Sequence, residues 1–291
     1  ITVEANPDDL TEERIVELSK NKVNRLSIGI QSFFETDLKL MNRAHNADEA
    51  KNCLKEAIKY FDNISLDLIY GIPGLSNKRW IENIDTALSY NIPHISSYAL
   101  TVEPKTALDN FIKKGIIQNV DDELAEQQFH MLIEKLEAKG FVHYELSNFG
   151  MPNYFSRNNT AYWQGKSYLG IGPSAHSYNG IERGWNVSNN IKYIKALQEN
   201  VVPIETETLS KTDTYNEYIM TGLRTIWGVS LAKMESEFGT EFLEAFTENV
   251  KPFIKKGLLE IKEDSAFNKI LTTTKKGKFL ADGIASDLFV I

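Results

Sequence analysis

The first 115 residues alternate short apolar runs with longer segments of helical periodicity. The apolar runs predict four strands, and each is followed by a segment in which apolar residues recur every three or four positions. The predicted strands span residues 1–6, 25–32, 64–70 and 94–100. Because strand and helix alternate, we expect parallel strands joined by helical crossovers, which is an α/β fold.

One polar side chain lies toward the carboxyl end of each predicted strand. These residues are Glu4, Gln31, Asp67 and Tyr98, at successive spacings of 27, 36 and 31 residues, about one strand–helix–strand unit each. In a parallel barrel, that end of the strands carries the active site. A single such residue is more simply explained as a loop contact or a helix cap. Four in register favour a shared site at one rim.

The middle of the chain has a different pattern. Residues 121–139 predict a long helix and residues 141–149 a strand, followed by an aromatic and glycine-rich stretch that includes Tyr162, Trp163 and His176. A long segment with little regular structure inside a compact domain is usually functional. Its aromatic density indicates a flat apolar ligand or an interface. The alternative is an extension of the sheet whose aromatic residues are core.

The C-terminal part predicts a winged-helix-like α+β module. Helical periodicity covers residues 212–227, 231–238 and 241–256, a hairpin follows at 258–262 and 269–274, and a last helix begins near residue 275. We therefore expect a division into residues 1–205 and residues 206–291. This module carries more acidic than basic residues, which disfavours DNA binding because phosphate contacts need a basic face.

Composition and charge limit the class of protein. The 291 residues are 42% hydrophobic and 25% charged, with a net charge of -8. This is the balance of a globular domain, with an acidic excess that disfavours nucleic-acid partners. No apolar run approaches the roughly 18 residues of a membrane helix. Cys53 is the only cysteine, so no internal disulfide can form, and we expect a cytoplasmic protein without an integral membrane segment.

Seven segments together resemble the oxygen-independent coproporphyrinogen III oxidase family of radical S-adenosylmethionine proteins, and its haem chaperone branch most of all. They are TVEANP at 2–7, RLSIGIQSF at 25–33, NRAH at 42–45, SLDLIYGIPG at 65–74, YAL at 98–100, YELSNF at 144–149 and LGIGPSAHS at 169–177. The resemblance implies a partial (βα)6 barrel that lacks its first strands, followed by the small C-terminal domain. Residue 1 lies inside a predicted strand, which also leads us to expect strands upstream.

The resemblance also implies cofactors and the residues that hold them. S-adenosylmethionine would be contacted by Glu4 and lined by Gln31, Arg43, Asp67 and Ala99, with His176 as a further neighbour. A carboxylate can accept hydrogen bonds from a ribose hydroxyl or an ammonium group, and the Arg43 guanidinium can pair with a carboxylate.

The family's [4Fe–4S] cluster needs a CxxxCxxC loop, which this sequence lacks. Cys53 has no cysteine partner and is best explained as a small buried side chain. We expect the cluster only in a longer protein that carries this loop, and no radical chemistry from this chain alone.

The haem chaperone branch carries an HNxxYW motif, which here reads NNTAYW at 158–163. Asparagine at 158 removes one expected iron ligand, because an amide binds iron poorly. Asn159, Tyr162 and Trp163 remain as haem candidates, with His176 as an alternative ligand. His176 could equally satisfy backbone groups in a tight turn.

These observations favour a haem-binding chaperone that transfers haem to a client protein. The alternative is an oxidase that decarboxylates two propionates of coproporphyrinogen III to give protoporphyrinogen IX. A third hypothesis is an inactive fragment of either.

Overall fold

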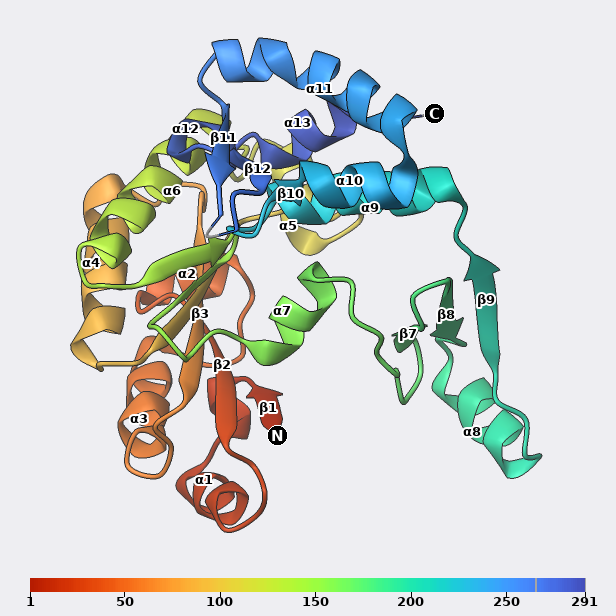
Figure 1. The fold of residues 1–291 in the computed structure, drawn as a ribbon. Coiled ribbons are helices and arrows are strands. Elements are labelled where there is room, and N and C mark those ends of the chain that lie inside the picture. The colour runs from red at the N-terminus through yellow and green to blue at the C-terminus, as the bar shows by residue number, and fades with distance from the viewer. Residues whose placement is uncertain (265, 291) are drawn as a thin grey trace. The chain divides into compact units, whose positions relative to one another are not determined.

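The computed structural model describes residues 1–264 and 266–290 and contains two compact units, residues 1–155 and residues 156–291 (Figure 1). We call them the first and the second unit. The first unit contains β1 (Thr2–Ala5), η1 (Pro7–Asp9), α1 (Glu12–Ser19), β2 (Arg25–Gln31), α2 (Glu35–Leu40), α3 (Ala47–Ala57), β3 (Ile64–Tyr70), α4 (Asn77–Ser89), β4 (His94–Ala99), α5 (Ala107–Lys113), α6 (Asp122–Glu137), β5 (Val142–Glu145) and β6 (Asn148–Gly150).

The strands of the first unit form one six-stranded sheet in the order β1-β2-β3-β4-β6-β5. Strands β1 to β4 are parallel, as the alternating pattern predicts. The single strand expected at residues 141–149 is instead a short antiparallel hairpin of β5 and β6, and β6 pairs antiparallel with β4. A turn at residues 146–147 divides this segment, so the sheet is mixed.

The two faces of this sheet differ in chemistry. On β2, Leu26, Ile28 and Ile30 are fully buried, and they alternate with Arg25, Ser27 and Gly29 on the opposite face. Helices α3, α4 and α6 lie along one side of the sheet in Figure 1. The apolar residues therefore form the helix-covered core, and the polar residues line the other, inner face.

A buried glutamine holds the loop that follows β3. The side chain of Gln128, on α6, accepts a hydrogen bond from the Gly71 N–H at 2.8 Å and donates one to the Leu75 carbonyl at 2.9 Å. The Gln128 carbonyl accepts a bond from the Trp80 indole N–H at 2.9 Å. Gln128 is fully buried, so its side chain fixes the Gly71–Leu75 loop against α6, while its backbone carbonyl holds Trp80 of α4.

The second unit contains α7 (Arg157–Trp163), β7 (His176–Tyr178), β8 (Glu182–Asn186), α8 (Asn190–Gln198), β9 (Ile204–Thr208), α9 (Lys211–Leu223), β10 (Val229–Ser230), α10 (Leu231–Phe238), α11 (Thr240–Lys255), β11 (Leu259–Glu263), β12 (Lys269–Thr273), α12 (Lys275–Lys278) and α13 (Ala281–Asp287). Two three-stranded sheets form, β7-β8-β9 and β10-β12-β11. From α9 onward, the order of helices and hairpin is the predicted winged-helix-like order.

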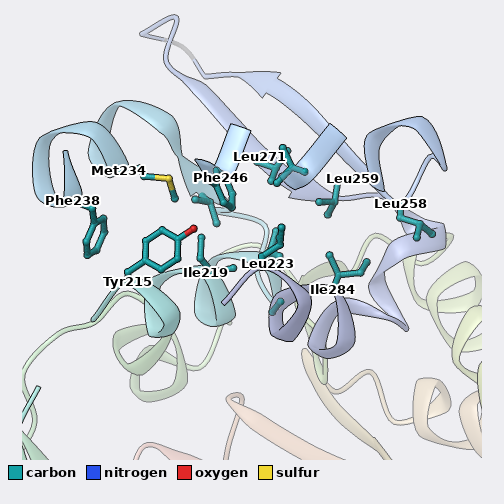
Figure 2. Packing of buried hydrophobic residues seen from close by; sticks show 14 residues of the cluster. Tyr215, Ile219, Leu223, Met234, Phe238, Phe246, Leu258, Leu259, Leu271 and Ile284 are labelled. Carbon is teal, nitrogen blue, oxygen red and sulfur yellow. The ribbon is translucent and has the colours of Figure 1, made fainter. Parts of the chain in front are cut away.

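The core of this module is built from side chains of both its helices and its hairpin (Figure 2). Tyr215, Ile219 and Leu223 project from α9 toward Phe246 of α11 and Leu271 of β12. All five are at most 1% exposed. The boundary expected between residues 205 and 206 stays a prediction.

We expect Gln128→Met to lower the free energy of unfolding by about 2–4 kcal/mol, because the Gly71 N–H and the Leu75 carbonyl lose their buried partner. Methionine keeps nearly the same volume, so lost hydrogen bonding dominates the effect. Urea unfolding measures the change, and Gln127→Met at the neighbouring exposed position is the matched control. Equal midpoints for the two variants would contradict this role of Gln128.

Candidate functional site

The strand register places predicted site residues on the inner face of the first unit. Glu4 of β1 lies opposite Ser27, and Asp67 of β3 lies opposite Ser96. Ser27 itself pairs with Ser65, two residues before Asp67, so Glu4 and Asp67 face the same side. Tyr98, two residues beyond Ser96, shares that face.

The pKa values of Asp67 and Tyr98 are both raised by partial burial and by neighbouring negative charges, although 43% of Tyr98 is exposed. Burial raises the pKa of Asp67 to about 6, and the negative charge of Glu4 adds to this effect. A hydrogen bond with Ser96 and the positive charges of Arg25 and Arg43 oppose it. Burial raises the pKa of Tyr98 to about 12, with the Asp67 charge acting in the same direction. Glu4, Asp67 and Tyr98 therefore interact within one site.

Gln31 and Arg43 meet over Gly29 of β2. Arg43 Nη2 donates to Asn6 Oδ1 at 3.1 Å. A Cβ atom at Gly29 would lie 2.8 Å from Gln31 Nε2 and 3.2 Å from Asn6 Oδ1, so the ends of these side chains lie close over the glycine and would have to move for a larger residue. Gln31 adopts the left-handed conformation, with φ of 65°, at the irregularity that ends β2. Asn6 joins the site although sequence reasoning gave it no role.

A buried histidine fixes the segment that carries Arg43. The Arg43 N–H bonds to the Leu38 carbonyl at 2.9 Å, which closes the end of α2. Two residues later, His45 Nε2 lies 3.1 Å from the Ile30 carbonyl, so the segment is held against β2. Arg43 is thus held within electrostatic range of Asp67.

Ala99 and His176 complete the residues predicted for S-adenosylmethionine. Ala99 ends β4, opposite Tyr70. His176 belongs to the second unit, where it is exposed on β7 opposite Trp185. The structure brings together Glu4, Asp67, Gln31 and Arg43, and leaves the role of His176 as a prediction.

Arg25 is a charged residue of this site that sequence reasoning missed. It begins β2, and burial lowers its pKa, while Tyr144, Asp67 and Glu4 act in the opposite direction. Within residues 1–264 and 266–290, its buried Nε atom has no hydrogen-bond partner. An arginine at the start of an otherwise apolar strand was the available signal.

The described residues do not fit an iron–sulfur cluster. Cys53 lies buried in α3, and burial raises the pKa of its thiol to about 12, which disfavours the thiolate that binds iron. No group of three or more histidine, cysteine or acidic side chains with metal-binding geometry occurs within the described ranges. The described residues therefore supply no set of ligands for a cluster.

The second unit contains a pocket of about 770 Å³ with an aromatic lining. Tyr162 and Trp163, at the end of α7, contribute two of the rings. The others come from Tyr168, Tyr178, Tyr218, Trp227 and Phe238. Asn159 and His176 do not line this pocket, so it contains two of the four predicted haem residues.

Charged groups surround the aromatic lining. Arg183 forms an ion pair with Glu217, and both line the pocket. Lys233 lies 4.6 Å from the centre of the Tyr218 ring. The Arg224 guanidinium lies 5.1 Å from the Trp163 ring, which anchors α7 against the end of α9. The pocket thus offers aromatic faces together with cations that can meet carboxylates.

Asp67→Asn should change the pH dependence of stability. The folded pKa of Asp67 lies above its unfolded value, so ionisation of this group destabilises the fold as pH rises from about 4 to about 6. Relative to wild type, we expect the variant to gain roughly 2–3 kcal/mol of unfolding free energy between pH 4 and pH 7. Urea unfolding at both pH values tests this, with Asp62→Asn, an exposed position, as control. A pH-independent difference would refute the prediction.

Anaerobic reconstitution of the 291-residue chain with iron and sulfide should yield no stoichiometric [4Fe–4S] absorbance, because the chain offers one buried thiol. Cys53→Ala should give the same background in visible absorbance and iron analysis. A bound cluster in wild type that disappears in Cys53→Ala would show that Cys53 is a ligand.

Comparisons with known proteins agree with this fold. Residues 1–87 match the Radical SAM superfamily and residues 209–280 match the HemN C-terminal domain. The structure of coproporphyrinogen III oxidase (HemN) from Escherichia coli superposes with a TM-score of 0.81 at 21% identity, covering 100% of this chain and 69% of that one. The expected α/β radical-SAM fold is therefore confirmed. No helix within the described ranges has the length and apolar character required to cross a membrane.

Curated relatives extend over nearly the whole chain. Heme chaperone HemW of Bacillus subtilis is 34% identical over 97% of this chain and 74% of its own length. Heme chaperone HemW of Lactococcus lactis is 33% identical over 89% of this chain and 68% of its own length. The namesake protein of Mycobacterium tuberculosis is 31% identical, with coverage of 99% and 71%. With this identity and coverage, the chain belongs to the HemW family of radical SAM proteins.

Proposed function

We propose that this protein is a haem chaperone that binds haem in the aromatic pocket of the second unit and passes it to client proteins. The observation that carries the proposal is the pocket itself. Tyr162 and Trp163 of the NNTAYW segment both line it. The names of the HemW relatives support the same cargo.

The pocket suits a flat macrocycle with acidic side groups. Its volume of about 770 Å³ lies within the range of ligand sites, and aromatic rings offer faces for stacking. Arg183 and Lys233 are the cations of the lining that can meet propionates, and each would exchange its present partner, Glu217 or Glu237, for a propionate. Tyr162 is 43% exposed, which leaves an open side through which cargo can leave.

S-adenosylmethionine is the cofactor proposed for the first unit. The carboxylates of Glu4 and Asp67 can accept hydrogen bonds from hydroxyl or ammonium groups, and Arg43 can bind a carboxylate. Gln31 and Ala99 complete the lining, and His176 remains a proposed neighbour. When bound together with a cluster, this cofactor would supply a carbon radical. The described residues include no ligand set for such a cluster.

Porphyrinogen oxidation is the less supported function. The likeness to HemN has 21% identity and therefore shows a shared fold alone. The sequence identity to the haem chaperones, 34% and 31%, is higher than the identity to HemN. We expect coproporphyrinogen III to remain unconverted when it is incubated anaerobically with this chain and a reductant, as followed by chromatography of the porphyrins. Multiple-turnover formation of protoporphyrinogen IX would establish the oxidase instead.

Titration with ferric haem tests the cargo site. Tyr162→Ala should raise the dissociation constant about tenfold, because a stacking face is lost. The Soret band measures binding, and circular dichroism confirms that the variant is folded. The matched control is Trp185→Ala, which removes an aromatic ring of the same unit that does not line the pocket. Weaker binding in the control with unchanged binding in Tyr162→Ala would place haem near His176, 6.4 Å from Trp185 between ring centres.

A further inference from the structure

We infer that Tyr168 is the axial ligand of ferric haem in this pocket, with Arg183 stabilising its phenolate. The inference rests on the proposed function, because it concerns how the same pocket holds its cargo. It assigns the iron ligand to a residue outside the NNTAYW segment.

The lining of the pocket leaves few groups that bind haem iron. Haem proteins hold iron through histidine, cysteine, methionine or tyrosine side chains. Among the described lining residues there is neither a histidine nor a cysteine. Met220 is partly buried and packs against the apolar core of the C-terminal module. The hydroxyl groups of four lining tyrosines remain.

Two of these hydroxyl groups are already engaged. The Tyr218 hydroxyl accepts a hydrogen bond from the Ser230 N–H at 2.8 Å, and burial raises its pKa to about 12. The Tyr178 hydroxyl donates to the Gly180 carbonyl at 3.2 Å. Within the part of the chain that the structure describes, the Tyr168 hydroxyl has no such partner.

Backbone pairing holds Tyr168 in place. Tyr168 and Tyr178 exchange both N–H···O bonds, each at 2.9 Å, as an isolated antiparallel bridge. Gly170 lies two residues further on, and a Cβ atom there would fall 2.1 Å from the His176 carbonyl oxygen. The chain can therefore fold back closely at this point only with glycine. The ligand position is built on paired backbone and not on a free loop.

The orientation of the two rings favours stacking by Tyr162 and coordination by Tyr168. Their centroids are 4.4 Å apart and their planes meet at 79°. A macrocycle stacked parallel to Tyr162 would thus meet the Tyr168 ring at a steep angle. This arrangement is compatible with stacking by Tyr162 and coordination through the oxygen of Tyr168, because a ring that crosses the macrocycle does not stack on it.

The charged groups near Tyr168 shift its pKa in opposite directions. Burial raises its pKa, the Glu217 charge and the neighbouring tyrosines add to this, and the Arg183 charge opposes it. Arg183 also lies 3.7 Å from Glu207. Lys233 and Glu237 are the other charged residues of the lining. When ferric iron binds, the phenol O–H breaks, the proton passes to solvent and an Fe–O bond forms without electron transfer, as cations displace protons from ligands elsewhere.

Resonance Raman and visible spectra of the ferric haem complex of the full chain test the assignment. Wild type should show phenolate ring modes and a phenolate-to-iron charge-transfer band. Tyr168→Phe keeps the ring but should lose both signals and bind haem at least about tenfold more weakly. Tyr178→Phe, which removes another hydroxyl from the same pocket, should retain the phenolate signals.

A second experiment measures the phenolate-to-iron charge-transfer band of the same complex as a function of pH. Arg183→Gln should move its appearance to higher pH, because positive charge beside the phenolate is lost. Glu217→Gln should move it to lower pH, because a negative charge is lost. Shifts in these opposite directions support the role of Arg183, and unchanged profiles overturn it.

The outcomes separate the two claims. Haem binding by wild type without phenolate signals, or signals that persist in Tyr168→Phe, overturns the ligand assignment alone. A spectrum of imidazole ligation that disappears in His176→Ala does the same and moves the ligand to His176. Failure of wild type to bind haem overturns the proposed function itself.

Discussion

The neutral ring of His94 joins three strands of the first unit. Its Nδ1 lies 2.7 Å from the Ser65 hydroxyl on β3, and its Nε2 lies 2.7 Å from the Tyr144 hydroxyl on β5. Burial lowers the pKa of His94 to about 3, so the ring is uncharged and has one donor and one acceptor nitrogen. Each removed partner would leave a buried polar atom unsatisfied, at a cost of about 1–3 kcal/mol. This contact ties the antiparallel hairpin to the parallel strands.

Further polar contacts extend from His94 across the inner face of the sheet. Beside His94, the Ser96 hydroxyl donates to Asn148 Oδ1 at 2.6 Å, and the Asn148 amide donates to Glu145. Asp67 faces Ser96 from the next strand. A parallel sheet usually buries apolar residues on both faces, whereas here one face is a hydrogen-bonded polar layer. The partly buried carboxylate of Asp67 is tolerated there because Ser96 hydrogen-bonds to it and the positive charges of Arg25 and Arg43 act on it.

The strands were predictable, and the inner contacts were not. Period-two patterns and strand–helix alternation located β1 to β4, and the polar residues at their ends identified Glu4 and Asp67. The hairpin was missed because two apolar-flanked strands with a two-residue turn look like one strand. Gln128 and Arg25 were missed because a glutamine within an amphipathic helix, or an arginine at the start of a strand, is ordinarily exposed. Only tertiary packing shows that the Gln128 side chain and the Arg25 Nε atom are buried.

The residues of the aromatic pocket were also predictable only in part. Sequence reasoning selected Tyr162 and Trp163, because aromatic density is visible along the chain. It did not select Arg183 or Glu217, which reach the pocket from β8 and α9. Their contribution depends on how the helices and strands of the second unit pack, and charged residues on such elements usually face solvent.

The proposed cargo site draws every lining residue from the second unit, whereas Glu4, Gln31, Arg43 and Asp67 all belong to the first. The two units have separate apolar cores, and α9 contributes both to the core of the second unit and to its pocket wall. Under the proposed function, haem affinity depends on the packing of α9 against its own module, because the same helix supplies both the core and the wall of the pocket.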